Sequence, residues 1–225
     1  MYALSPCFDR RTRTTFVAAL LLGVLSPFLV TAADSPGSPF PGLELVTSKN
    51  VGALYRRRDV DTSAYSKIFI AEPTVEFSKN WNPRSYGTYG LSAAQVTKIR
   101  VDLAAMAKSV FAKTLTDGGY AIVTEVGDGV LAITPNIVNV FINAPDVPTA
   151  ARSKTYTLDA GSATLALQVN DAVTGTLLAV ALDQRRSGSS KMQWATSVSN
   201  RAAASDMLKG WAEQLKRELD AARAK

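Results

Sequence analysis

Residues 91–143 read LSAAQVTKIRVDLAAMAKSVFAKTLTDGGYAIVTEVGDGVLAITPNIVNVFIN, and this stretch decides the fold of the chain. In its first part apolar side chains recur every three or four positions, which is the spacing of one helix face. These residues are Val96, Ile99, Leu103, Met106 and Val110. Ser92 and Gln95 have the spacing of a capping box, and Gly118 or Gly119 can end a helix. The pattern predicts one long amphipathic helix.

The remainder of this stretch predicts two strands. Apolar residues dominate Tyr120 to Thr124 and Val130 to Ile142, with Gly127-Asp128-Gly129 between them. An Asp-Gly pair tolerates the positive φ angles of a tight reversal, so we expect the two strands to form a hairpin. Pro135 has no backbone donor and indicates a bulge or an edge in the second strand.

One strand is predicted before this stretch, and a hairpin and a second helix after it. Lys67 to Phe77 is apolar but contains Pro73, which again indicates an edge or a bulge. Apolar and polar residues alternate from Ala163 to Asn170, a turn follows at Asp171 to Gly175, and Leu177 to Leu182 forms the return strand. The second helix carries an apolar stripe. Its members are Leu208, Trp211, Leu215, Leu219 and Ala222.

These elements predict an α+β fold of two layers. We expect about five strands in a mainly antiparallel sheet, with the two long amphipathic helices on one face. The pattern leaves the strand order open. Residues 62–225 would form this single domain, and residues 34–61 would form a linker that becomes a docked arm near Leu54-Tyr55.

Residues 1–33 have the parts of a secretory signal peptide. Three arginines between residues 10 and 13 precede an apolar run at residues 16–30, and small residues follow at 31–33. An uncleaved membrane anchor is the alternative, but the run is shorter than the roughly 20 residues of a spanning helix and contains Pro27. We therefore expect export to the periplasm or cell envelope.

The charge of the chain argues against a nucleic-acid partner. Removing three Arg and one Asp with residues 1–33 lowers the net charge from +6 to +4. Nucleic-acid-binding proteins cluster Lys and Arg on one element, whereas here these residues are spread out, apart from Arg56-Arg57-Arg58. That triplet can meet anionic lipid head groups or a sugar phosphate, and a solvated edge is the alternative.

The content of cysteine and histidine excludes several kinds of chemistry. The chain has no histidine and one cysteine, Cys7, which precedes the apolar run of the predicted signal. Disulfides, cysteine nucleophiles and His-dependent triads are therefore excluded from the mature chain, as are zinc and copper sites built from His and Cys. No cofactor is indicated. Because no cysteine follows the apolar run, a lipid anchor has no attachment point and membrane association would be peripheral.

The aromatic stretch at residues 78–90 is the candidate binding site. It contains Trp81, Arg84, Tyr86 and Tyr89. Rings with polar tips offer a sugar or a peptide both contact area and orientation, so these four residues are the candidates for ligand or partner binding. The alternative is that the rings only cover the core. No catalytic or metal-binding constellation accompanies them.

Several features along the chain form a family signature. They are Tyr65 before the first strand, Trp81, the helix start Leu91-Ser92, the turn Asp171 to Gly175, and Trp211-Ala212 with Leu215. In this order they resemble the domain of unknown function 3313 family of predicted bacterial envelope proteins, over roughly Pro41 to Leu219. The resemblance implies an envelope protein, with many lipoproteins among the relatives, and it implies no catalytic residue.

Two function classes follow from these observations. The first is a non-enzymatic binding or accessory module that meets an envelope protein, a lipid or a glycan. It would use the aromatic stretch and the sheet face opposite the helices, which antiparallel sheets often leave open. The residues expected on that face are Thr164, Ala166, Gln168, Ala179 and Ala181.

The second class is a hydrolase of envelope glycans that works with carboxylates alone, because a chain without histidine leaves acid-base chemistry to Asp and Glu. The candidates are Glu72, Glu76, Asp128, Asp171 and Asp183. Two carboxylates about 5 to 10 Å apart in a cleft would support it. Asp128 and Asp171 already occupy turn positions, so the first class is favoured.

Overall fold

The computed structural model describes residues 38–58, 60, 64–86, 90–143, 156–194 and 197–223, without the side chains of residues 156–160 and 188–199. The predicted signal peptide lies outside these residues. The strands are β1 (Glu44–Val46), β2 (Ala53–Arg56), β3 (Lys67–Ile70), β4 (Val75–Phe77), β5 (Ala121–Val123), β6 (Val130–Ile142), β7 (Tyr156–Asp171) and β8 (Leu177–Trp194). The helices are α1 (Ala93–Asp117) and α2 (Ser197–Arg223).

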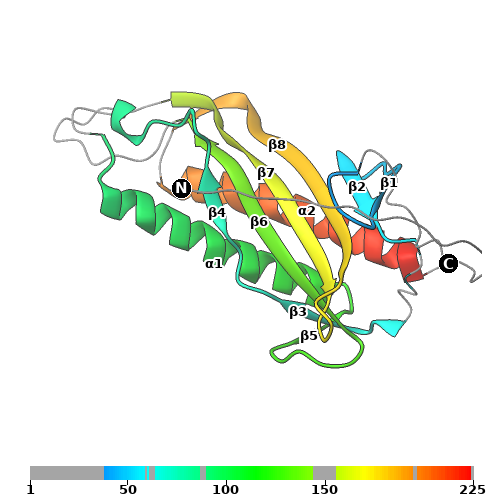
Figure 1. Cartoon of the computed structure of the whole chain (residues 1–225). Helices are drawn as coiled ribbons and strands as arrows, with labels where there is room; N and C mark the ends of the chain where they lie inside the picture. Colours follow the sequence, from blue (N-terminus) through cyan, green and yellow to red (C-terminus); the bar gives the residue numbers. More distant parts are fainter. Residues whose placement is uncertain are drawn as a thin grey trace, which may run out of the picture. The chain divides into compact units, whose positions relative to one another are not determined.

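The strands of the described residues form one mixed sheet, and both helices pack against it. In Figure 1, α2 passes behind the long strands and α1 runs along the β3–β4 side of the sheet. The strand order is β1-β2-β8-β7-β6-β3-β5, and β4 also pairs with β6. The predicted α+β class is confirmed. The predicted strand number and mainly antiparallel character are wrong, because the arm adds β1 and β2 and because β3 and β4 both run parallel to β6.

The break between β3 and β4 explains both strand prolines. Pro73 lies in the break, which is bounded by two backbone hydrogen bonds to β6, Ala71 N to Ile133 O (2.9 Å) and Ile137 N to Thr74 O (2.8 Å). Alternate residues of a strand direct their backbone groups to the same neighbour. The backbone nitrogen of Pro135, which has no hydrogen to donate, therefore faces this break. The predicted bulge of β6 lies further along, between Val138 and Phe141.

The predicted hairpin of β5 and β6 is wrong. Both strands pair in parallel with β3, which lies between them. Gly129 has a φ of 68° as a tight turn would allow, but its carbonyl accepts hydrogen bonds from the N–H groups of Ser66 (3.1 Å) and Lys67 (3.3 Å). The loop after β5 therefore passes over the end of β3 instead of reversing on itself.

Helix α1 begins as its sequence predicts. The Ser92 hydroxyl accepts the Gln95 N–H at 3.3 Å, and the Gln95 side chain accepts the Ser92 N–H at 2.8 Å. The stripe is buried unevenly along the helix. Phe111 and Leu115 in its second half are fully buried, whereas Ile99 and Leu103 in its first half are only half-buried. The sheet and α2 therefore cover α1 completely only towards its end.

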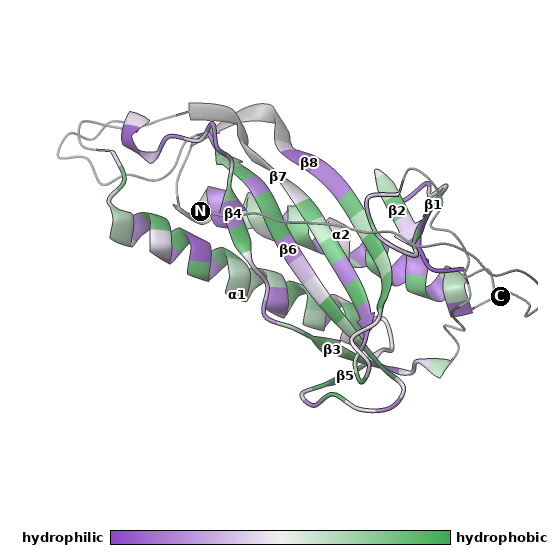
Figure 2. Ribbon diagram, viewed as in Figure 1, coloured by the Kyte–Doolittle hydropathy of each residue, from purple (hydrophilic) through white to green (hydrophobic). Residues whose placement is uncertain are grey.

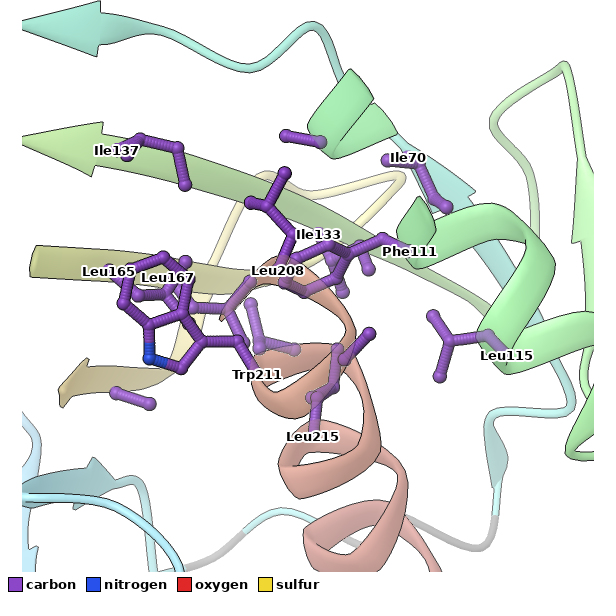
Figure 3. Close-up of a cluster of buried hydrophobic side chains, with 14 of the residues drawn as sticks. Ile70, Phe111, Leu115, Ile133, Ile137, Leu165, Leu167, Leu208, Trp211 and Leu215 are labelled. Atoms are coloured by element: carbon purple, nitrogen blue, oxygen red, sulfur yellow. The ribbon is translucent and has the colours of Figure 1, made fainter. Parts of the chain in front are cut away.

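The core lies between the sheet and the two helices. Figure 3 shows Leu208, Trp211 and Leu215 of α2 beside Leu165 and Leu167 of β7, with Phe111 and Leu115 of α1 on the other side of the cluster. Figure 2 shows hydrophilic residues interspersed among hydrophobic ones along β6 and β7, and in β8 a hydrophobic stretch followed by a hydrophilic one. One face of the long strands packs against the helices. The other face is open at Gln168, whereas Val180, its partner on β8, is 2% exposed.

One predicted sheet face needs correction. Ala179 and Ala181 were expected beside Gln168 on the open face, but they pair with Val169 and Leu167, whose side chains face the helices. The register of β7 and β8 shifts by one residue between Val169 and Asn170. A shift of one residue turns every following side chain to the other face. Thr164, Ala166 and Gln168 keep the open face.

Carboxylates hold the arm to the sheet and to α2. One of them, Glu218 of α2, accepts hydrogen bonds from Ser48 Oγ (2.8 Å) and Asn50 Nδ2 (2.7 Å). Strand β2 pairs with β8. At the end of this pair Asp183 accepts hydrogen bonds from the Gly52 N–H (3.1 Å), the Trp211 indole N–H (2.8 Å) and Arg185 Nε (3.0 Å). Asp183 therefore joins the arm, β8 and α2 at one point.

Candidate functional site

An apolar groove of about 250 Å³ opens between the two helices and the sheet. Its walls come from the first halves of α1 and α2 and from the ends of β6, β7 and β8. The main apolar residues are Ile99, Leu103 and Met106 of α1, Met207, Leu208 and Trp211 of α2, and Val140 and Ile142 of β6. The groove is therefore an opening in the same layer that forms the core.

Small residues create the space in this groove. Ala203 and Ala204 stand on the side of α2 that lines it, and Gly161 and Ala163 stand on β7. Gly161 has a φ of 153°, and any Cβ at this position would collide with the carbonyl of Phe141. The backbone of β7 therefore closes on β6 here with no side chain to fill the groove.

The rim of the groove carries charges. Asp102 of α1 accepts Lys98 Nζ at 2.9 Å, and Arg201 Nη2 of α2 lies 3.6 Å from the same carboxylate oxygen. Lys98 and Arg201 are both well exposed, with 73% and 67% of their side-chain surface accessible. Two cations thus share one carboxylate, so this part of the rim is positively charged.

The predicted aromatic site is built as a cover for the end of β6. Trp81 is 7% exposed and stacks on Phe77 with ring centroids 4.2 Å apart. The Trp81 indole N–H and the Tyr86 hydroxyl both donate to the carbonyl of Ile142, at 3.2 and 2.6 Å. Burial raises the pKa of Tyr86. Both polar tips therefore hold the loop in place.

The other two predicted residues of this site contribute less. Arg84 is exposed, and its backbone N–H is accepted by the Asn82 side chain at 3.0 Å. Tyr89 lies outside the described residues. The structure therefore brings Trp81 and Tyr86 together at Ile142, whose side chain lines the apolar groove. The predicted site and the groove meet at this one strand residue.

A second, polar hollow of about 440 Å³ lies where the aromatic loop meets the sheet. It is lined by Ser78, Asn80, Asn139, Phe141, Asn143, Ser162, Gln184 and Arg186. Asn139 stands at the bulge of β6 with a φ of 53°, a conformation that Asn adopts more readily than most residues. Residues with amide, hydroxyl and guanidinium groups therefore line this hollow together with one aromatic residue, Phe141.

The carboxylates proposed for hydrolysis serve structural roles or lie on the surface. Glu72 pairs with Lys108 at 2.8 Å, and Asp183 holds the arm. Asp171 accepts the N–H of Thr174 at 2.7 Å and the Tyr65 hydroxyl at 2.9 Å, and these hydrogen bonds, that of Thr174 first, lower its pKa. None of the five candidates lines either hollow. The described residues also contain no group of three acids able to hold a metal.

The sequence does not indicate the apolar groove. Its pattern shows which side of each helix is apolar, but not how far along the helix that side is covered. The one usable signal is Ala202-Ala203-Ala204 at the start of α2, where large apolar residues would be needed to close the layer. Within the described residues, neither helix has the length and apolar composition that crossing a membrane requires.

Comparison with known proteins places the chain by family. The model of a family described as "Protein of unknown function (DUF3313)" matches residues 37–215. None of the curated proteins matches the chain. The resemblance that the sequence features carried, over roughly Pro41 to Leu219, is therefore confirmed.

Some solved structures are weakly similar to the chain. The PelC dodecamer from Paraburkholderia phytofirmans is 11% identical, with 75% of this chain and 95% of that chain covered and a TM-score of 0.32. Protein XCC0632 from Xanthomonas campestris is 15% identical, with 68% and 83% covered and a TM-score of 0.40. A minor lipoprotein from Acinetobacter baumannii is 8% identical, with 71% and 95% covered and a TM-score of 0.34. Similarity at this level transfers no function.

Proposed function

The chain belongs to the DUF3313 family of proteins of unknown function, and we propose that it is an exported, non-enzymatic binding module of the cell envelope. In this proposal the apolar groove between α1 and α2 takes up an apolar group of the ligand. The observation that carries it is an open groove of about 250 Å³ whose walls are almost entirely apolar. Open apolar hollows of this kind are the usual places for ligands.

The energetics of the groove favour binding of an apolar group. Four apolar side chains that line the groove are only half-buried. They are Ile99, Leu103, Met106 and Met207. Each CH₂ group that a ligand buries there contributes roughly 0.8 kcal/mol, offset by the loss of ligand freedom. The two methionines can adapt their shape to different chains, because Met has several rotatable bonds.

The surroundings of the groove support binding without catalysis. The carboxylate at its rim, Asp102, is held between two cations. The candidate acids for hydrolysis lie outside it, and Asp183 is occupied by three hydrogen bonds, one each from the arm, β8 and α2. General acid-base catalysis needs a group within hydrogen-bonding reach of the substrate. The residues that line this groove are therefore suited to binding a ligand and not to acid-base catalysis.

Export is supported by residues 1–33, with their arginines, apolar run and small residues. The mature chain contains neither cysteine nor histidine, which fits an oxidising compartment in which a free thiol is a liability. Cell fractionation of the full-length chain and N-terminal sequencing of the product test this part. A full-length product that stays in the cytoplasm would contradict export.

Binding is tested by filling the groove. In the exported protein, Ala204→Leu adds volume inside the groove, and Ala202→Leu adds the same volume on the exposed side of the same helix. We expect the uncharged fluorophore N-phenylnaphthylamine to bind about tenfold more weakly to Ala204→Leu than to wild type and Ala202→Leu. Circular dichroism and thermal unfolding show whether each variant is folded, and Ala203→Leu is the second groove variant. Equal binding by folded Ala204→Leu and wild type would contradict the proposal.

A second candidate function, glycan binding, is favoured by the polar hollow. Amides and an arginine line it together with Phe141, and such groups fix the orientation of a polar ligand in a hollow. Gln184→Ala removes a lining amide, whereas Gln168→Ala removes an amide that lies outside the hollow. Calorimetric titration with oligosaccharides from the envelope would show binding that only Gln184→Ala weakens. No heat of binding with the wild type would reject this candidate.

A further inference from the structure

We infer that the ligand of the apolar groove is a single acyl chain with an anionic head group, and that Arg201 of α2 binds this head group at the rim. This inference rests on the proposed function and adds the chemical class of the ligand. It depends on the size of the groove, on its opening, and on the charges around Asp102.

The size of the groove fits one chain. Its volume of about 250 Å³ lies just below the roughly 300 to 1,000 Å³ of common small-ligand pockets. A lipid with two chains needs more space than this. The groove is also open along one side, so the end of a chain can lie inside while its head group remains in water.

The interior of the groove suits a hydrocarbon. Its lining is mostly apolar and includes Met106 and Met207, one on each helix. The uncharged polar members of the lining are Ser162, Ser187 and Asn200. The two charged residues in the lining, Asp102 and Arg201, are half-buried and exposed respectively and form an ion pair with each other. To enter deeper into the groove, a polar head group would have to lose its bound water, which is costly. The head group therefore belongs at the rim.

The charges at the rim favour an anion. Asp102 neutralises one of its two cationic neighbours and leaves the equivalent of one positive charge. Lys98 holds Asp102 at 2.9 Å, whereas Arg201 lies at 3.6 Å from it. Arg201 thus has the looser contact, and a guanidinium can bind a carboxylate through two parallel hydrogen bonds. An anionic head group would find Arg201 accessible without breaking a short hydrogen bond.

The test uses dodecanoic acid and dodecanol as competitors of N-phenylnaphthylamine on the exported wild-type protein at neutral pH. The two competitors share the chain and differ in the charge of the head group. We expect the acid to displace the fluorophore at about tenfold lower concentration than the alcohol. In Arg201→Gln this preference should be lost, so that the acid and the alcohol displace the fluorophore at similar concentrations.

Lys209→Gln is the matched control, because Lys209 is an exposed cation on the same helix outside the groove. It should retain the preference for the acid. Equal displacement by acid and alcohol, or an unchanged preference in Arg201→Gln, would overturn the inference while leaving the groove as a binding site. Displacement by vesicles of a two-chain anionic phospholipid but not by dodecanoic acid would overturn it too. A fluorophore that does not bind at all would instead reject the proposed function.

Discussion

The two halves of the helix layer differ although they carry the same apolar stripe. In the second halves of α1 and α2, Phe111, Leu115 and Leu215 are buried in the core. In the first halves, Ile99 and Leu103 are half-buried and border the groove. The comparison shows that a periodic apolar stripe specifies which side of a helix faces the sheet, while the neighbouring elements decide whether that side becomes core or binding site.

The polar contacts between the two helix regions also differ between the packed end and the groove end. At the packed end, the Tyr120 hydroxyl donates to Asp220 of α2 at 2.7 Å, and Arg223 lies 4.2 Å above the Tyr120 ring. At the groove end, the ion pair between α1 and α2 is the 3.6 Å contact of Arg201 with Asp102. The two helices are therefore held more firmly at the end where the core is closed.

The largest expected effect compares one leucine from each half. Leu115→Ala removes a fully buried side chain and should lower the free energy of unfolding by about 2 to 5 kcal/mol. Leu103→Ala removes a half-buried side chain at the groove and should cost roughly 1 kcal/mol. Urea unfolding of both variants gives the two values. Equal losses would mean that the two halves are packed alike.

A smaller effect is expected at Asp183, between the two halves. Asp183→Ala leaves the Trp211 indole N–H without its acceptor and releases the arm at Gly52, which should cost about 1 to 3 kcal/mol. Glu213→Ala, on the exposed side of α2, should change the stability by less than about 0.5 kcal/mol. Urea unfolding distinguishes the two. If the two variants are equally stable, Asp183 does not hold the arm.

The pH dependence of stability tests the packed end. Burial, then the hydrogen bond to Asp220, raises the pKa of Tyr120 from 10.0 to about 12. The protonated phenol is therefore favoured in the folded state, so its contribution is complete below pH 10 and is lost as the pH rises towards 12. The free energy of unfolding of the wild type should fall over this interval, and that of Tyr120→Phe should fall less. Parallel curves for the two proteins would contradict this link.

The smallest effect is expected at the turn between β7 and β8. Hydrogen bonds from Thr174 lower the pKa of the Asp171 carboxyl below 3.8. The carboxylate therefore stabilises the fold above this value, and its contribution is lost as the pH falls through the lowered pKa. Asp171→Asn should be slightly less stable than wild type at neutral pH, and thermal unfolding midpoints should converge in acid. If the difference in stability between the two proteins persists unchanged at low pH, it does not come from the charge of Asp171.

Local signals predicted the helices and the last turn well. Ser92 and Gln95 form their capping box, and Asp171 organises the turn before β8. Long-range pairing was predicted poorly. The residues around Gly129 are compatible with a hairpin and with a loop that passes over β3. No local pattern in the sequence indicates that β3 lies between β5 and β6. The shift near Val169 likewise reversed the expected face of Ala179, because one extra residue changes the parity of a strand.

The candidate site illustrates the same limit. Trp81 and Tyr86 were selected for their polar tips, which the fold uses to hold the loop on Ile142. Only the arrangement of five separate elements, α1, α2, β6, β7 and β8, reveals the groove beside them. A binding site that is formed by incomplete coverage leaves little trace in the residues themselves, because each of them remains an ordinary apolar residue.

The position of Trp211 makes the protein its own optical reporter. This indole lines the groove, is 1% exposed and donates its N–H to Asp183, so a guest that enters the groove changes the immediate surroundings of a natural fluorophore. The colour and intensity of its emission can follow occupancy in the unlabelled molecule, with Trp211→Phe as the reference from which this signal is missing.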